Sequence, residues 1–188
     1  MSRYGIPDES FIRGKIPMTK AEIRALTLNK LNIKDSDIIW DIGAGTGSIS
    51  VETALNTPLG QVWAIEKNPE AVKLLKANKE KFSCQSLHII EGSAPQIFNE
   101  IPKPTKAVIG GSGGNMQEIL KYLWFNTGVE VIVINTITLN STNQALEFLT
   151  KLAAKIDASQ ISVNNIKLVN GYYMLQSQNP IFIISARR

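Results

Sequence analysis

The chain has 188 residues, and 44% of them are hydrophobic, which is enough to build the core of one domain over residues 1–188. Its one cysteine and one histidine are too few for a disulfide framework, a cysteine- or histidine-based metal site, or a hydrolytic triad. The net charge of +4 favours an acidic partner, yet no run of five basic residues occurs, which argues against nucleic acid.

The sequence also bears on where the protein works. No stretch approaches the roughly 20 apolar residues of a membrane-spanning helix. The first five residues show no apolar signal region. We therefore expect a cytoplasmic protein that makes no membrane contact and holds no metal.

Residues 5–17 contain two glycines and two prolines, which predict an irregular N-terminal arm over residues 1–18. A capping box follows, in which Thr19 is the N-cap of a helix and Glu22 occupies the third helical position. Residues 32–37 should then turn the chain into its central strand.

The central strand is the apolar run 38–42, which stops in a glycine-rich turn at residues 43–47, before a predicted helix over residues 48–55. Glycines let the backbone approach a ligand, and the unpaired N–H groups of the helix start face the same crevice. The dinucleotide fingerprint would place its third glycine at position 48, where Ser48 stands, so the spacing argues against NAD. A second strand over residues 60–66 ends in Glu66, whose carboxylate can accept both hydroxyls of a ribose.

The pattern Asp41-x-Gly43-x-Gly45-x-Gly47 resembles the first motif of S-adenosylmethionine-dependent methyltransferases of the Rossmann-like class. This resemblance implies that the turn holds the methionine part of S-adenosylmethionine. The alternative is a tight strand-to-helix turn beside a solvated strand end. Because the turn and Glu66 occur together in register, we favour the nucleotide site.

The later elements alternate between strands and helices. We predict strands over residues 87–91, 107–109 and 129–134, and helices over residues 69–82, 116–123 and 141–156, with a short helix after residue 95. The end of the chain, including residues 161–163 and 181–184, reads as strands, with a hairpin closing the sheet. The predicted fold is α/β: a Rossmann-like class I methyltransferase fold, whose mainly parallel seven-stranded sheet has an antiparallel last strand and helices on both faces.

Five segments that follow predicted strands should meet at one edge of this sheet: residues 43–47, 66, 93–94, 110–114 and 135–136. Residues 93–94 lie where such a methyltransferase contacts adenine, although an N-cap and turn would also explain them. Four glycines within residues 110–114 carry an entropy cost, so either a large ligand comes close or the loop is simply flexible. The Asn/Asp-Pro-Pro-aromatic motif of N-directed nucleic-acid methyltransferases is absent there.

His88 lies inside a predicted strand and reads as a structural residue, and Cys84 has no activating feature beside it in the sequence. The chemistry must therefore come mostly from the cofactor. We assign no catalytic residue.

Further motifs narrow the resemblance. They are residues 5–8 with Phe11, residues 17–20 with Glu22 and Arg24, and residues 41–47, 91–95 and 110–114. Together they make the chain similar to the cobalamin-pathway methyltransferases that methylate C15 of a (cobalt-)precorrin-6B-type intermediate and decarboxylate its C12 acetate. The resemblance implies a cofactor site formed by Thr19, Asp41, Gly43, Ala44, Gly45, Thr46, Gly47, Glu66, Ser93 and Ala94. It also implies a tetrapyrrole site formed by Gly110, Gly111, Ser112, Gly113 and Gly114.

The same resemblance carries expectations about partners. An acceptor with many acetate and propionate groups would be attracted to the basic residues near the N-terminal arm, namely Arg13, Lys15, Lys20 and Arg24. The alternative for each of these residues is an ordinary solvated charge. Family members form tetramers, so we expect a homotetramer. The chain is too short to include the C5-methylating activity of the pathway, which we expect in a separate protein. No residue is assigned to the decarboxylation.

The sequence differs from the family pattern at two places in the cofactor site. Glu66 replaces the more usual aspartate, and Ser93 replaces an aspartate before Ala94. Two other functions stay open: a methyltransferase of the same fold acting on RNA or another small molecule, and a nucleotide-binding regulatory module that is not an enzyme.

Overall fold

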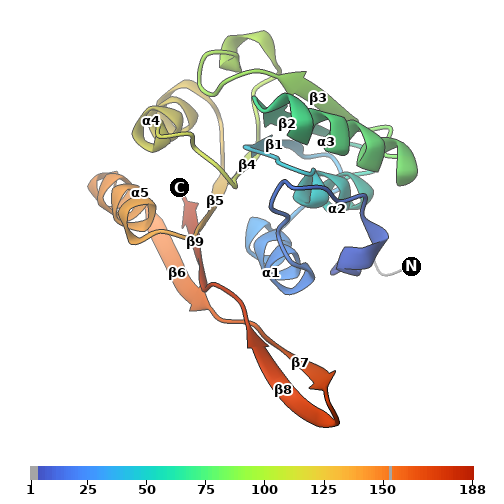
Figure 1. The fold of residues 1–188 in the computed structure, drawn as a ribbon. Coiled ribbons are helices and arrows are strands. Elements are labelled where there is room, and N and C mark those ends of the chain that lie inside the picture. The colour runs from blue at the N-terminus through green and yellow to red at the C-terminus, as the bar shows by residue number, and fades with distance from the viewer. Residues whose placement is uncertain (1–3, 153) are drawn as a thin grey trace.

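A computed structural model describes residues 4–152 and 154–188. Its centre is a seven-stranded sheet in the order β3-β2-β1-β4-β5-β9-β6 (Figure 1). The strands are β1 (Ile38–Ile42), β2 (Gln61–Glu66), β3 (Leu87–Glu91), β4 (Lys106–Ile109), β5 (Val131–Thr136), β6 (Lys155–Ile161) and β9 (Ile181–Arg187). The first five run parallel, and β9 is antiparallel to both β5 and β6. The predicted sheet and its antiparallel last strand are confirmed.

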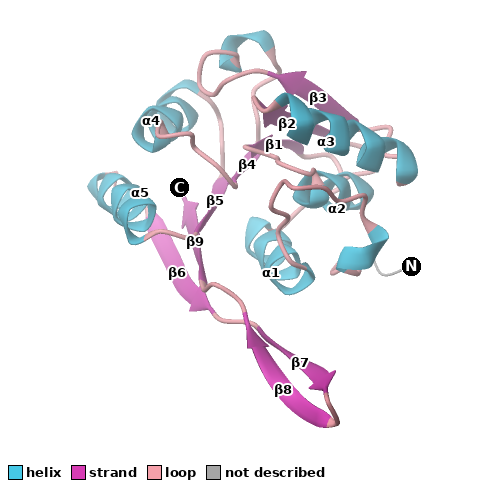
Figure 2. Cartoon of the chain, in the orientation of Figure 1, coloured by secondary structure: helices cyan, strands magenta, loops and turns pink. Residues whose placement is uncertain are grey.

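Helices cover both faces of the sheet, as predicted (Figure 2). One face carries α1 (Ala21–Leu31), α2 (Ser48–Asn56) and α3 (Pro69–Lys81), and the other carries α4 (Met116–Asn126) and α5 (Leu139–Lys151). Short 3-10 turns are η1 (Asp8–Ser10) and η2 (Phe98–Glu100). With both faces covered, the inner strands are apolar along nearly their whole length, and the Trp40 side chain in β1 is 0% exposed.

The start of α1 differs from the prediction. The N-cap is Lys20, its side chain makes no capping hydrogen bond, and the helix begins at Ala21, so the capping box at Thr19 is wrong. The carbonyl oxygen of Thr19 instead accepts a hydrogen bond from Nη1 of Arg24. A tertiary contact therefore decides how the chain enters this helix, in place of the local Thr-Glu pattern.

The C-terminal part also differs. The helix predicted to reach residue 156 ends at Lys151, and Ile156 lies in β6, whose residues 155–161 pair with β9 in an antiparallel register. The strand predicted at residues 161–163 contributes only Ile161, the last residue of β6. No tight hairpin joins β6 to β9, since a separate pair of strands lies between them in sequence.

That pair consists of β7 (Asn164–Val169) and β8 (Tyr172–Ser177), and we call it the β7–β8 hairpin. It extends away from the rest of the molecule (Figure 1). Every residue of both strands is exposed, including the large apolar side chains Ile166, Leu168, Val169, Tyr172, Tyr173, Met174 and Leu175. Such a contiguous apolar surface is unusual for a segment that faces only water.

In the described residues, no helix has both the length and the apolar character needed to cross a membrane.

Candidate functional site

Two cavities open at the edge of the sheet where the parallel strands end. The larger has a volume of about 530 Å³ and the smaller about 150 Å³. Both are lined by Gly43, Gly111 and Ser112, so they meet at these residues. The five segments predicted to converge here do so, but they divide between two compartments.

The partition between the cavities is the close approach of two loops. In the sheet, Ile42 lies beside Ile109, so the loops after β1 and β4 leave side by side. The amides of Gly110 and Gly111 donate to the carbonyl oxygen of Ile42 at 2.9 and 3.2 Å. A Cβ atom on Gly43 would lie 2.4 Å from the carbonyl oxygen of Gly111, and Gly43 has a φ of +71°. Only glycine fits at position 43.

The turn after β1 lines the larger cavity through Gly43, Ala44, Gly45 and Thr46. Gly45 has a φ of +57°, and the nearest atom to an added Cβ would be the Pro17 carbonyl oxygen at 3.7 Å. The backbone at Gly45 is thus open on the side where a side chain would stand. This is a cradle that a ligand can occupy.

Gly47 has a different role from its neighbours. It lines neither cavity, although the sequence placed it in the cofactor site. It is the N-cap of α2 with a φ of +77°, and an added Cβ would lie 2.0 Å from Cδ1 of Leu75 in α3. Close packing of two helices, and a left-handed backbone, explain this glycine.

Asp41 is 1% exposed and lines the larger cavity. Its Oδ2 accepts a hydrogen bond of 2.5 Å from Oγ of Ser50. Burial raises the pKa of Asp41 to about 6; the hydroxyl of Ser50 opposes this shift, and the nearby charge of Glu66 adds to it. In the described part of the chain Asp41 forms no ion pair. A buried carboxyl without a counter-ion suits a cationic ligand.

The smaller cavity is lined by the end of β2 and the loop after β3, through Glu66, Lys67, Ser93 and Ala94. Oε2 of Glu66 accepts from the amide of Gly45 at 2.8 Å, and Oε1 accepts from the amides of Lys67 and Asn68 at 2.8 Å each. A carboxylate can accept about four hydrogen bonds, and three are already made by backbone amides. The remaining lone-pair position is on Oε2. The glutamate therefore also holds the glycine turn in place.

The glycine loop at residues 110–114 borders both cavities rather than one. Gly110, Gly111 and Ser112 line the larger cavity, and Gly111, Ser112 and Gly113 line the smaller. Gly114 lines neither. The loop is thus placed between two cavities, which the sequence did not indicate.

Two residues were missed: Lys67, which lines the smaller cavity, and Asn115, which bonds to its lining residue Ala94. Asn115, the N-cap of α4, makes no capping bond with its side chain; its Nδ2 donates to the carbonyl oxygen of Ala94 at 3.0 Å. Lys67 reaches the glycine loop, since an added Cβ on Gly113 would lie 2.8 Å from its Nζ. The hydrogen bond of Asn115 ties two separate loops together, and Lys67 lies close to Gly113. No local pattern signals either arrangement.

The larger cavity has two further walls. One is the segment Pro17, Met18, Thr19 and Lys20, which leads from the N-terminal arm into α1. The other combines the β5–α5 connection with the base of the β7–β8 hairpin, through Asn135, Thr136, Ile137, Thr138, Ser141, Ile161, Val163, Gln178, Asn179 and Ile181. Only Asn135 and Thr136 of this second wall were predicted.

Arg24 does not face the site. It is 0% exposed, and its Nε donates to Oε1 of Glu52 at 2.7 Å, so the prediction that it attracts the acceptor is wrong. Among the described residues, no cluster of three or more His, Cys, Asp and Glu side chains could hold a metal ion.

The fold, the glycine turn and the acid at the end of β2 define a class I methyltransferase of the Rossmann-like type. Residues 10–188 match the family described as the precorrin methyltransferase domain, and the chain belongs to this family.

Relatives cover almost the whole chain. A protein of Sulfurisphaera tokodaii, named as a probable cobalt-precorrin-6B C(15)-methyltransferase (decarboxylating), is 44% identical over 187 residues, covering 96% of this chain and 95% of that protein. The cobalt-precorrin-6B C(15)-methyltransferase (decarboxylating) of Salmonella typhimurium is 34% identical, with 96% and 95% covered. The crystal structure of a precorrin-6y C5,15-methyltransferase from Geobacter metallireducens superposes with a TM-score of 0.94 at 35% identity, and each chain covers 100% of the other.

We predict that Asp41→Asn stabilises the protein more at about pH 8 than at about pH 4. The folded-state pKa of Asp41 is raised from 3.8 to about 6. The stability contributed by the protonated carboxyl is therefore complete below about pH 4 and lost as the pH rises through about 6. Asn carries no charge to desolvate, so the difference in stabilisation between the two pH values should be on the order of 2 kcal/mol.

Urea unfolding at both pH values measures this difference, with the exposed Asp35→Asn as control. Equal effects of Asp41→Asn at both pH values would contradict the raised pKa.

Proposed function

We propose that this protein is an S-adenosylmethionine-dependent C-methyltransferase of cobalamin biosynthesis. It methylates C15 of a (cobalt-)precorrin-6B-type intermediate and removes the C12 acetate carboxyl group as carbon dioxide. The observation that carries the proposal is the pair of cavities meeting at Gly43 and Gly111 in a chain of the precorrin methyltransferase family. One compartment is suited to a nucleoside, and the other is large enough for the rest of the cofactor and an edge of a broad acceptor.

The residues at the site fit S-adenosylmethionine. The open backbone at Gly45 provides a cradle, and buried Asp41 provides a carboxyl group for the cationic methionine part. Glu66 can accept one ribose hydroxyl at Oε2, and a second would have to replace one of its backbone amides. Ser93 and Ala94 would hold the adenine. When bound, the cofactor supplies an electrophilic methyl group on a sulfonium.

The protein's part in methyl transfer is to align the acceptor and exclude water. Apolar side chains, among them Ile23, Ile109 and Met116, line the larger cavity and can pack against a conjugated macrocycle. C15 then acts as an electron-rich carbon nucleophile. In the decarboxylation, the bond between the C12 methylene and its carboxylate breaks, its electron pair passes into the conjugated ring, and a proton takes the place of carbon dioxide. No residue is assigned to deliver that proton.

We also propose that copies of the chain associate through the β7–β8 hairpin. Its apolar side chains are exposed in the described part of the chain, and Lys167 is the only charged residue among residues 164–177. A partner selected by charge therefore has little to recognise, whereas a second hairpin offers a matching apolar surface and free strand edges. A homotetramer, a separate C5-methyltransferase and a cytoplasmic location stay predictions from the sequence.

The direct test is incubation of the purified protein with S-adenosylmethionine and cobalt-precorrin-6B, and in parallel with the metal-free precorrin. Mass spectrometry should show the gain of one methyl group and the loss of carbon dioxide in at least one of the two. Methyl transfer to bulk RNA with both precorrins unchanged would replace this proposal by the RNA methyltransferase.

Glu66→Ala should weaken binding of S-adenosylhomocysteine by about 1.5 to 3 kcal/mol for each charge-assisted hydrogen bond lost. Calorimetry measures the affinity. Glu91→Ala is the matched control, because Glu91 lies beside Glu66 in the sheet, is exposed and lines neither cavity. Equal affinity of the two variants, with both folded, would remove Glu66 from the cofactor site.

The double variant Tyr173→Lys with Leu175→Lys should lower the oligomeric state measured by light scattering. Tyr173 and Leu175 lie on one face of β8, opposite Leu168 and Ile166 of β7, so the change places charge in the proposed contact. Leu59→Lys, at a site 79% exposed between α2 and β2, is the control and should change nothing. A wild-type monomer at all concentrations would refute association through the hairpin.

A further inference from the structure

The acceptor proposed above carries many carboxylates, and the larger cavity has few charges to receive them. We propose that Lys20 is the residue that binds one of these carboxylates, and that Asp8 and Arg24 hold Lys20 in position for it. This inference rests on the proposed function and names the recognition group of the same site.

Lys20 differs from the other basic residues near the N-terminal arm in its burial and in its place at the cavity. Arg24 is buried and paired with Glu52. Arg13 and Lys15 are exposed, and neither lines a cavity. Lys20 lines the larger cavity and is the single basic residue among the described residues that do so. A carboxylate entering this cavity therefore has one ammonium group to meet.

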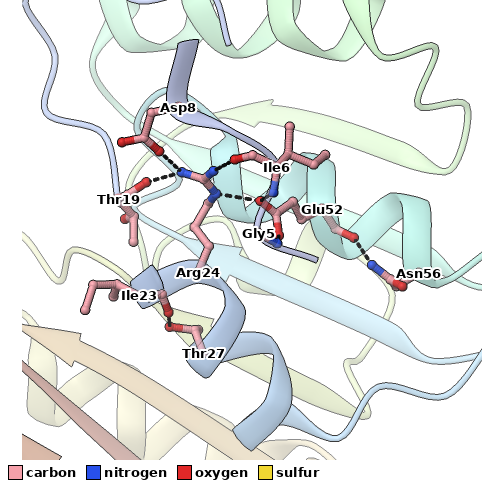
Figure 3. A network of polar contacts seen from close by, with 9 residues as sticks. All are labelled: Gly5, Ile6, Asp8, Thr19, Ile23, Arg24, Thr27, Glu52 and Asn56. Carbon is pink, nitrogen blue, oxygen red and sulfur yellow. Dashed lines mark hydrogen bonds and ion pairs between the residues drawn. The ribbon is translucent and has the colours of Figure 1, made fainter. Parts of the chain in front are cut away.

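Lys20 stands at the end of a row of alternating charges that begins inside the protein. Glu52 accepts from Nε of Arg24 at 2.7 Å, and Nη1 of Arg24 donates to Oδ1 of Asp8 at 2.8 Å (Figure 3). The other oxygen of Asp8, Oδ2, lies 3.3 Å from Nζ of Lys20. Asp8 is thus shared between a buried cation and a cation at the cavity.

This sharing makes the contact to Lys20 exchangeable. Asp8 keeps its shorter bond to buried Arg24 if Lys20 turns to a ligand, so the aspartate is not left unpaired. The Lys20 side chain is 32% exposed, and an ion pair that water reaches contributes little stability. A substrate carboxylate can therefore replace Asp8 at low cost, while Asp8 keeps the ammonium group near the cavity before binding.

The backbone around Lys20 is fixed by the same network (Figure 3). Glu52 accepts from the amides of Gly5 and Ile6 at 2.9 and 3.0 Å. Arg24 donates to the carbonyl oxygens of Ile6 and Thr19. The N-terminal arm and the start of α1 are therefore held to α2, and Lys20 is presented from a rigid wall. A preorganised cation loses less entropy on binding than a mobile one.

The test compares Lys20→Gln with Lys103→Gln, a matched change at an exposed lysine that lines neither cavity. Turnover of the precorrin accepted by the wild-type protein gives kcat and KM at several salt concentrations, and calorimetry gives the affinity for S-adenosylhomocysteine. We expect Lys20→Gln to raise the acceptor KM by about tenfold or more, as for a lost hydrogen bond between charged groups, and to reduce the salt dependence of KM. Lys20→Arg keeps the positive charge and should have an acceptor KM close to that of the wild-type protein. The affinity for S-adenosylhomocysteine should not change in either variant.

An acceptor KM for Lys20→Gln equal to that of Lys103→Gln would overturn the assignment while leaving the enzyme activity in place. A parallel loss of cofactor affinity would show that Lys20 supports the fold of the site instead, and would also overturn it. If the wild-type protein converts no precorrin, the proposed function fails first, and this inference falls with it.

Discussion

The contact between the backbones of Gly43 and Gly111 is the constraint on which the site depends. β1 and β4 are neighbours in a parallel sheet, so the loops that follow them must pass each other at its edge. They pass so closely that a single Cβ at position 43 would lie 2.4 Å from a carbonyl oxygen. This contact separates the smaller cavity from the larger one and still lets them meet. In the proposed arrangement, a nucleoside in the smaller cavity would present its reactive end to an acceptor in the larger one.

The charges around this contact are few, and each has a distinct role. Glu66 uses most of its hydrogen-bonding capacity to hold Gly45 and the start of α3, so the carboxylate is preorganised. Asp41 is buried with a raised pKa and forms no ion pair with any residue that the structure describes, which favours a cationic ligand. Strong acids and bases are otherwise scarce, in keeping with a reaction in which the cofactor supplies the electrophile.

The sequence predicted what depends on local backbone geometry. The turn at residues 43–47 could be placed because its glycines follow a buried strand, and the sheet followed from the alternation of strands and helices. The β7–β8 hairpin was missed although its signal is present: Asn170 and Gly171 lie between the two strands, both with positive φ, as in a type I′ hairpin turn. The base of this hairpin then supplies cavity residues that were also missed.

What depends on distant contacts could not be read from the sequence. Arg24 had the pattern of a surface cation on a helix, yet its partner Glu52 lies 28 residues further along the chain. Arg24 also donates a hydrogen bond to the carbonyl oxygen of Thr19, and the N-cap expected at Thr19 does not form. The two compartments of the site likewise arise from the meeting of separate loops, which no single motif describes.

The central claim is that the cofactor spans the junction at Gly43 and Gly111. A crystal structure of the protein with S-adenosylhomocysteine tests it directly. We predict the adenosine in the smaller cavity, with the ribose against Glu66 and the adenine beside Ala94, and the homocysteine in the larger cavity near Asp41 and Gly45. Adenosine located in the larger cavity, or a ligand that does not cross the junction, would contradict this account.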